Sequence, residues 1–117
     1  MKRGGPIKRR KRLSSPWNPR RYRADRVARE LALGRDSHHC QRCGEWMNLE
    51  VHHVHSRRYG ALRHVLDNLL TLCTVCHRWW HANPKEAYAW WRERVGSERA
   101  EALETAKRLR KPAGEER

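Results

Sequence analysis

The chain has 117 residues, of which 38% are hydrophobic and none is phenylalanine, and its mean hydropathy is -1.09. These values exclude a membrane-embedded or large multidomain protein and predict one small domain whose core is too thin to be stable without a further cross-link. The formal net charge is +14, and residues 1–23 contain ten Lys or Arg and no acid, which favours a polyanionic partner.

Residues 1–19 combine this charge with several glycines and prolines, a composition that predicts a disordered basic arm. Arg9, Arg10 and Arg12 are its candidate nucleic-acid contacts, because guanidinium groups suit phosphate oxygens. The start of the arm is basic with no apolar run behind it, so we expect no signal peptide and a cytoplasmic protein.

Residues 20–95 are expected to form the folded domain, and residues 96–117 a C-terminal helix and tail. The first helix is predicted over residues 19–33, between Asn18-Pro19 and Gly34. Its apolar residues are Tyr22, Val27, Leu31 and Leu33. The elements expected after it are strands near residues 49–54 and 69–72, a basic loop at 55–67 between them, and helices that start near Cys73–Cys76, at Pro84 and at Ser97.

Four cysteines form two Cys-x-x-Cys turns, Cys40 with Cys43 and Cys73 with Cys76. Two such turns supply the four thiolates of a tetrahedral structural zinc site. Disulfides would need an oxidising compartment, and a redox motif would use one pair and leave the other unexplained. The pattern therefore favours a structural Zn²⁺ whose binding contributes to folding.

Histidines and one asparagine lie between and just after these turns. His52 and His53 would point to opposite faces of a strand, whereas His77 and His81, four residues apart on a helix, share one face. His52 could join them as a third metal ligand, which leaves His53 free to activate water. Asn68 could hydrogen-bond the backbone and fix the strand that carries His53.

The span from Cys40 to His81 resembles the HNH, or ββα-metal, endonucleases, including small phage and bacterial members. The resemblance implies an α+β fold, with a ββα-metal core held by the four-cysteine zinc site and flanked by helices. It also implies that His53, Asn68 and His77 are the catalytic H, N and H. His52 and His81 would be added metal ligands, as in the colicin-type nuclease domains.

The implied activity is metal-dependent hydrolysis of DNA, with a structural Zn²⁺ and one catalytic divalent ion. An all-imidazole site suits Mn²⁺, Ni²⁺, Co²⁺ or Zn²⁺ better than Mg²⁺. Arg57 and Arg58 are candidates for binding the scissile phosphate. The expected partner is double-stranded DNA bound with low sequence specificity, in a phage or bacterial cell and without a membrane; a homodimer, or a packaging or recombination partner, is compatible with the sequence.

Two other readings stay open at this point. The chain could be a zinc-stabilised nucleic-acid-binding module without cleavage, or a nuclease subunit active only in a complex. The spacing of the histidines favours the enzyme, because a four-cysteine binding module has no need of them. His55 and His64 are expected at the surface or against phosphate, and one tryptophan of each doublet, 79–80 and 90–91, is expected in the core.

Overall fold

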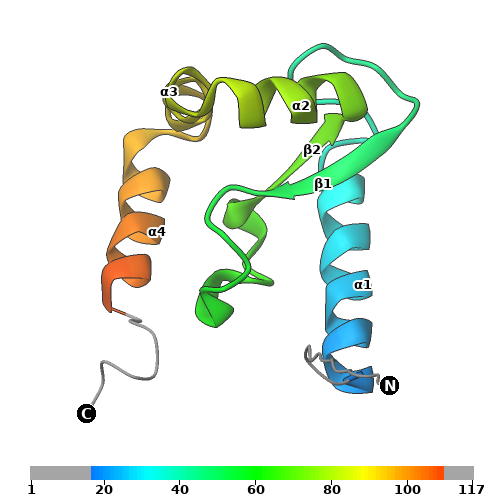
Figure 1. The fold of residues 1–117 in the computed structure, drawn as a ribbon, viewed down its shortest axis with the longest axis vertical. Coiled ribbons are helices and arrows are strands. Elements are labelled where there is room, and N and C mark those ends of the chain that lie inside the picture. Colours follow the sequence, from blue (N-terminus) through cyan, green and yellow to red (C-terminus); the bar gives the residue numbers. More distant parts are fainter. Residues whose placement is uncertain (1–16, 110–117) are drawn as a thin grey trace, which may run out of the picture.

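The computed structural model describes residues 17–109 (Figure 1). The arm with Arg9, Arg10 and Arg12, and the last eight residues of the tail, lie outside these residues. The elements in chain order are α1 (Pro19–Arg35), β1 (Leu49–His53), the 3₁₀ helices η2 (Gly60–Leu62) and η3 (Leu66–Asn68), β2 (Leu69–Cys73), α2 (Thr74–Ala82), α3 (Pro84–Val95) and α4 (Ser97–Leu109).

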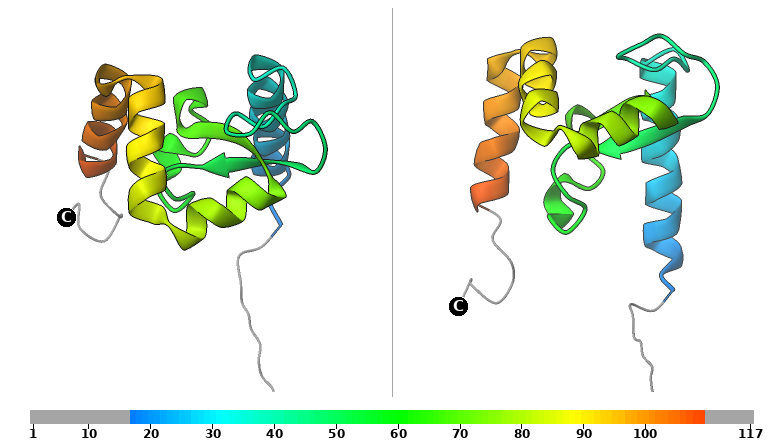
Figure 2. Two further views of the ribbon diagram at one scale, coloured as in Figure 1. Left: turned by 90° about the horizontal axis from the view of Figure 1, so that it is seen from above. Right: turned by 45° about the horizontal axis from the view of Figure 1, so that its top comes forward.

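The predicted α+β architecture is confirmed, and its centre is a two-stranded antiparallel hairpin. β1 and β2 pair from Leu49 opposite Cys73 to His53 opposite Leu69. All five residues of β2 are buried, because α1 packs on one face of the hairpin and α2 on the other (Figure 2). A two-stranded sheet is only marginally stable by itself, so these helices supply the burial that it needs.

Helix α1 differs from the prediction in its end and in its buried face. The Asn18 side chain caps it by accepting from the Arg21 N–H at 3.1 Å, but the helix continues through Gly34 to Arg35. It packs against the hairpin through Ala28 and Ala32, since small side chains let the helix approach closely. Of the four apolar residues named for this helix, Leu33 is buried, whereas Tyr22, Val27 and Leu31 are exposed.

The main hydrophobic core lies between the hairpin and the three C-terminal helices. Trp80 of α2 and Trp91 of α3 are buried in it, whereas Trp79 and Trp90 are partly exposed and contact each other edge to face at 6.0 Å. The prediction of one core member in each tryptophan doublet is therefore confirmed. Asn83 does not cap α3 with its side chain, which instead donates to the Trp79 carbonyl at 3.2 Å.

The helices are arranged around the loop that connects β1 to β2. In Figure 1, α1 descends on one side of this loop and α4 on the other, while α2 and α3 cross above. Among residues 17–109, no helix has both the length and the apolar composition that crossing a membrane requires.

Candidate active site

The four cysteines converge at one point, and we call them the cysteine cluster. Their Sγ atoms all lie within 4.8 Å of one another, and the four thiols are free. The Sγ atoms of Cys43 and Cys73 are 3.6 Å apart, far beyond the roughly 2.05 Å of a disulfide. This geometry fits four thiolates around one tetrahedral ion, as the sequence predicts for zinc.

Backbone N–H groups are directed at two sulfurs of the cysteine cluster. The N–H groups of Arg42 and Cys43 point at the Cys40 Sγ, at 3.4 and 3.5 Å, and the N–H of Cys76 points at the Cys73 Sγ at 3.5 Å. Burial raises the pKa of Cys40, but the backbone N–H groups around it outweigh burial and lower this pKa to about 6. Cys40 is therefore the thiol of the cluster that ionises readily, whereas burial raises the pKa of Cys76 to about 12.

A second group, which we call the histidine cluster, consists of His52 on β1 and of His77 and His81 on α2. Their ligand nitrogens also lie within 4.8 Å of one another, with His52 Nδ1 and His77 Nε2 only 3.0 Å apart. His52 is buried, His77 half-buried and His81 exposed. The cluster can therefore hold a metal on its buried side and still leave room for water and a phosphate on its open side.

Burial is the main reason that the pKa of His52 is lowered, to about 3, with the neighbouring His77 and His81 adding to the effect. His52 is therefore neutral near pH 7, as a metal ligand must be. The ring of Trp80 lies 4.4 Å from the ring of His52 and forms an apolar wall behind it.

Glu50 is a site residue that sequence reasoning missed. Its Oε1 lies 2.5 Å from His77 Nδ1, and the hydrogen bond from His77 lowers the pKa of the Glu50 carboxyl. A carboxylate that accepts from Nδ1–H leaves the Nε2 lone pair of His77 for the ion. The available signal was the spacing, since Glu50 precedes His52 by two residues and shares its face of β1.

His53 points to the other side of β1, where it lines a cavity of about 170 Å³ beside α1. Its Nε2 lies 3.0 Å from the Arg63 carbonyl oxygen. Because a carbonyl can only accept, Nε2 must carry the proton, which leaves a free lone pair on Nδ1. Burial lowers the pKa of His53, so the ring is neutral and can accept a proton.

Asn68 is fully buried and bonds to the loop that follows β1. Its Oδ1 accepts from the His55 N–H at 2.8 Å, and its Nδ2 donates to the carbonyls of His55 at 3.0 Å and of Leu62 at 3.1 Å. These three bonds fix the chain immediately after His53. These are backbone hydrogen bonds of the kind predicted for Asn68, and its catalytic role stays a prediction.

His55 itself was expected at the surface, and that expectation is wrong. It is buried, with its ring edge-to-face against Tyr88 and Trp91, because α3 packs across the loop. His64 is exposed, as expected, and its Nε2 lies 2.6 Å from Oδ1 of Asp25 on α1.

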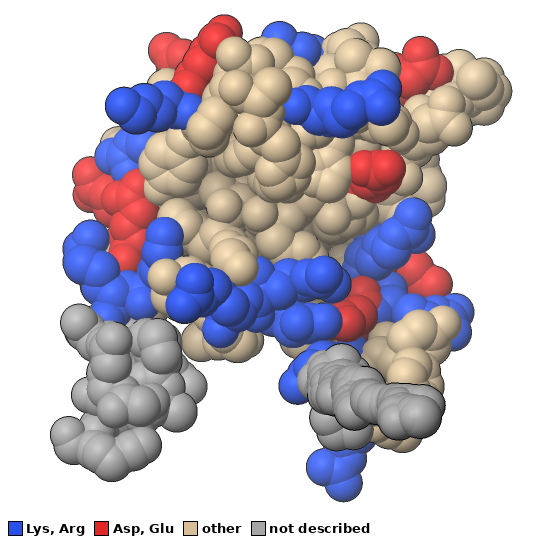
Figure 3. Space-filling model, viewed as in Figure 1, with Lys and Arg blue, Asp and Glu red and all other residues tan. Residues whose placement is uncertain are grey.

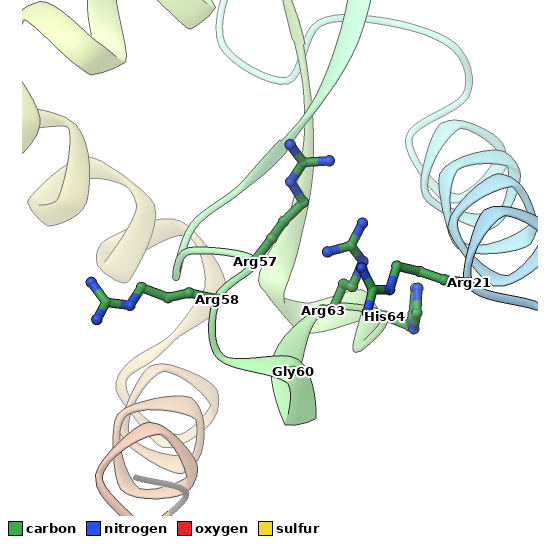
Figure 4. Close-up of a pocket in the computed structure, with 6 residues that line it drawn as sticks. All are labelled: Arg21, Arg57, Arg58, Gly60, Arg63 and His64. Atoms are coloured by element: carbon green, nitrogen blue, oxygen red, sulfur yellow. The ribbon is translucent and has the colours of Figure 1, made fainter. Parts of the chain in front are cut away.

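Basic side chains meet in a cavity of about 710 Å³ between this loop and α1. Figure 4 shows that Arg57 points toward the hairpin, whereas Arg58 points away toward α4. Arg57 also lines the smaller cavity that contains His53, so of the two arginines it is the one placed near the histidine. In Figure 3, Lys and Arg side chains gather along the lower part of the face that is shown. The cavity is lined by Arg21, Arg57, Arg58, Gly60, Arg63 and His64.

Comparison with known proteins gives a match to the part of the chain that carries the cysteine cluster, the histidine cluster, His53 and Asn68. The family model described as HNH endonuclease matches residues 40–83, from the first cysteine of the cysteine cluster to the residue after α2. These residues, less than half of the chain, therefore match the HNH endonuclease family. No curated protein and no solved structure gives a significant match to the chain.

Proposed function

We propose that the protein is a metal-dependent endonuclease that hydrolyses phosphodiester bonds in DNA. The observation that carries this proposal is the pair of neighbours on β1. His52 belongs to the histidine cluster, and His53 has a free Nδ1 lone pair because its Nε2 donates to the Arg63 carbonyl. Consecutive residues at the end of β1 thus supply a metal ligand and a proton acceptor, the two kinds of group that hydrolysis of a phosphodiester requires.

In the proposed reaction, His53 Nδ1 accepts a proton from a water molecule as the water oxygen forms a bond to phosphorus. The bond from phosphorus to the sugar oxygen on the opposite side breaks, and that oxygen takes a proton from solvent. Arg57 binds a non-bridging phosphate oxygen, for which a guanidinium fork is suited. A divalent ion held by the histidine cluster, when bound, neutralises the phosphate and stabilises the leaving oxygen.

The chemistry of the donors favours Mn²⁺, Ni²⁺, Co²⁺ or Zn²⁺ over Mg²⁺ in the histidine cluster, because all three donors are imidazoles. The four thiolates of the cysteine cluster favour Zn²⁺ as a structural ion. Arginine contacts to phosphate carry no base information, so we propose cleavage with low sequence specificity.

The decisive experiment measures cleavage of supercoiled, linear, branched and single-stranded DNA by wild-type protein loaded with each of these ions in turn. We expect cleavage with at least one transition ion and weaker cleavage with Mg²⁺. If no ion supports cleavage of any DNA although the protein binds DNA, the chain is instead a zinc-stabilised binding module or a subunit that needs a partner.

The contribution of the basic arm to DNA binding can be measured separately from cleavage. Deleting residues 1–16 removes seven Lys or Arg residues, so affinity should fall and its dependence on salt should become shallower. Each lost phosphate contact should reduce the slope of log affinity against log salt by about 0.9. A slope equal to that of the full chain would contradict a role of the arm in binding DNA.

A further inference from the structure

The residue that accepts the hydrogen bond from His53 is held in place by a helix outside the matched HNH segment. Asp25 of α1 accepts from Arg63 Nε and Nη2, both at 2.8 Å, in a two-pronged ion pair. Its Oδ1 also lies 2.6 Å from His64 Nε2. A carboxylate paired in this way with a guanidinium restrains both position and orientation.

One residue, Arg63, links this ion pair to His53, since its guanidinium contacts Asp25 and its carbonyl contacts His53. The Arg63 carbonyl oxygen is 3.0 Å from His53 Nε2, and the Arg63 N–H donates to the Gly60 carbonyl at 3.2 Å. On the preceding residue, the Leu62 carbonyl accepts from the Asn68 side chain at 3.1 Å. Asn68 therefore fixes one side of this turn, and Asp25 fixes the other.

We propose that Asp25 is a positioning residue, which holds the Arg63 carbonyl against His53 Nε2 and so keeps the Nδ1 lone pair free for water. The inference rests on the proposed function, since it matters for catalysis only if His53 is the base. It also extends the functional unit upstream of residues 40–83 to include α1.

The Asp25 carboxyl stays ionised at moderate pH. The hydrogen bond from Arg63 is the main reason that the pKa of this carboxyl lies well below its usual range, and His64 adds to the effect against the opposing influence of burial. The ion pair is therefore present wherever the enzyme is folded at moderate pH.

Docking of α1 does not depend on Asp25, and this separates positioning from general stability. At the other end of the helix, Arg35 donates to the carbonyls of Leu66 and Leu69, both at 2.7 Å. Ala28 and Ala32 pack on Leu69 between the two ends. Removing the Asp25 carboxylate should thus leave α1 in place and release mainly the Arg63 turn.

The test uses full-length protein with ¹⁵N-labelled histidine, and His53→Ala to assign the His53 signals. At one fixed pH, wild type should give one neutral His53 tautomer with the proton on Nε2. Asp25→Ala should give a mixture with the Nδ1–H tautomer, and kcat should fall roughly 10- to 100-fold at an unchanged KM because the base is misplaced. Asp25→Glu should restore much of the Nε2–H tautomer and much of kcat.

Glu30→Ala is the matched control, because Glu30 is an exposed acid of the same helix whose ion pair, with Arg26 at 3.7 Å, stays within α1. It should behave as wild type. If Asp25→Ala fails to fold, Asp25→Asn keeps the size and one acceptor and should still shift the tautomer.

An unchanged His53 tautomer in a folded Asp25→Ala or Asp25→Asn variant would overturn the inference, as would a loss confined to KM. The tautomer is read without any cleavage. A wild-type protein that cuts no DNA would therefore contradict the proposed function, whereas the spectra would still decide whether Asp25 positions His53.

Discussion

The cysteine cluster and the histidine cluster both include residues of α2, but the first is closed to solvent on most sides and the second is open. Three of the four cysteines are buried in the main core, and the cluster offers four thiols, enough for all four positions of a tetrahedral ion. The histidine cluster supplies three donors, and its last member, His81, is exposed. A closed site stabilises the fold, whereas an open site leaves room for a substrate.

This difference also decides which substitutions the fold can tolerate. Cys40, Cys73 and Cys76 belong to the same hydrophobic cluster as Leu72 and Trp91, so damage to the cysteine cluster reaches the centre of the protein. In the histidine cluster only His52 is buried. Changes at His77 or His81 should accordingly alter chemistry and leave the fold intact.

The largest expected effect is that of Cys40→Ser. Apparent zinc-binding free energies in small zinc domains are about 10–16 kcal/mol, comparable with the total stability of a domain, about 5–15 kcal/mol. We expect the variant to lose cooperative thermal unfolding and its zinc, as measured by circular dichroism and elemental analysis. A folded variant with a melting temperature near that of wild type would mean that the cysteine cluster is not the structural site.

His77→Ala tests whether the two clusters bind metal independently. It removes one of three donors of the open site, so the second ion and nearly all cleavage should be lost. One zinc per chain should remain, and the melting temperature should change by only a few degrees, as expected for ΔΔG of about 1 kcal/mol or less. Loss of all metal from this variant would show that the clusters are not independent.

His53→Ala should spare both ions and remove only the proton acceptor. General-base catalysis is typically worth roughly 10² to 10⁴ in rate, so kcat should fall by that factor at unchanged metal content and DNA affinity. His39→Ala, at an exposed histidine before the cysteine cluster, is the matched control and should cut like wild type. Equal cleavage by both variants would refute the assignment of His53.

Glu50→Gln is expected to have the smallest effect. The amide can still contact His77 Nδ1 but no longer carries the negative charge that pairs with the ring N–H and holds the ring in position. Losing such a partner typically weakens metal affinity or activity about 10- to 100-fold. Titration with Co²⁺ or Ni²⁺ measures this, with Glu93→Gln at an exposed position of α3 as control. Wild-type affinity in Glu50→Gln would show that the contact does not tune the ion.

The sequence predicts the cysteine and histidine clusters well because their spacing carries the information. Each Cys-x-x-Cys turn brings two thiols together locally, and histidines four residues apart on a helix share one face. The hairpin and the starts of the helices follow from equally local patterns. What depends on spacing within an element could therefore be predicted from the sequence.

Features that arise from contacts between distant elements could not be predicted in the same way. Asp25 and Arg63 are 38 positions apart in the sequence, and Glu50 and His77 are 27 apart. No local pattern predicts either contact. The exposed Val27 has the same cause, since the close approach of α1 to the hairpin selects alanines for the contact. Likewise, only the packing of α3 reveals that His55 is buried.

Cys73 is at once the last residue of β2, the N-cap of α2 and a member of the cysteine cluster. The ion held there would thus set the rotational phase of α2. Since an α-helix turns about 100° per residue, one residue inserted between Cys76 and His77 would swing both helical histidines away from His52 while leaving all four thiolates in place. The interval of four residues from Cys73 to His77 therefore has a fixed length: the exposed Val75 within it can vary, whereas Cys76 and the number of residues cannot.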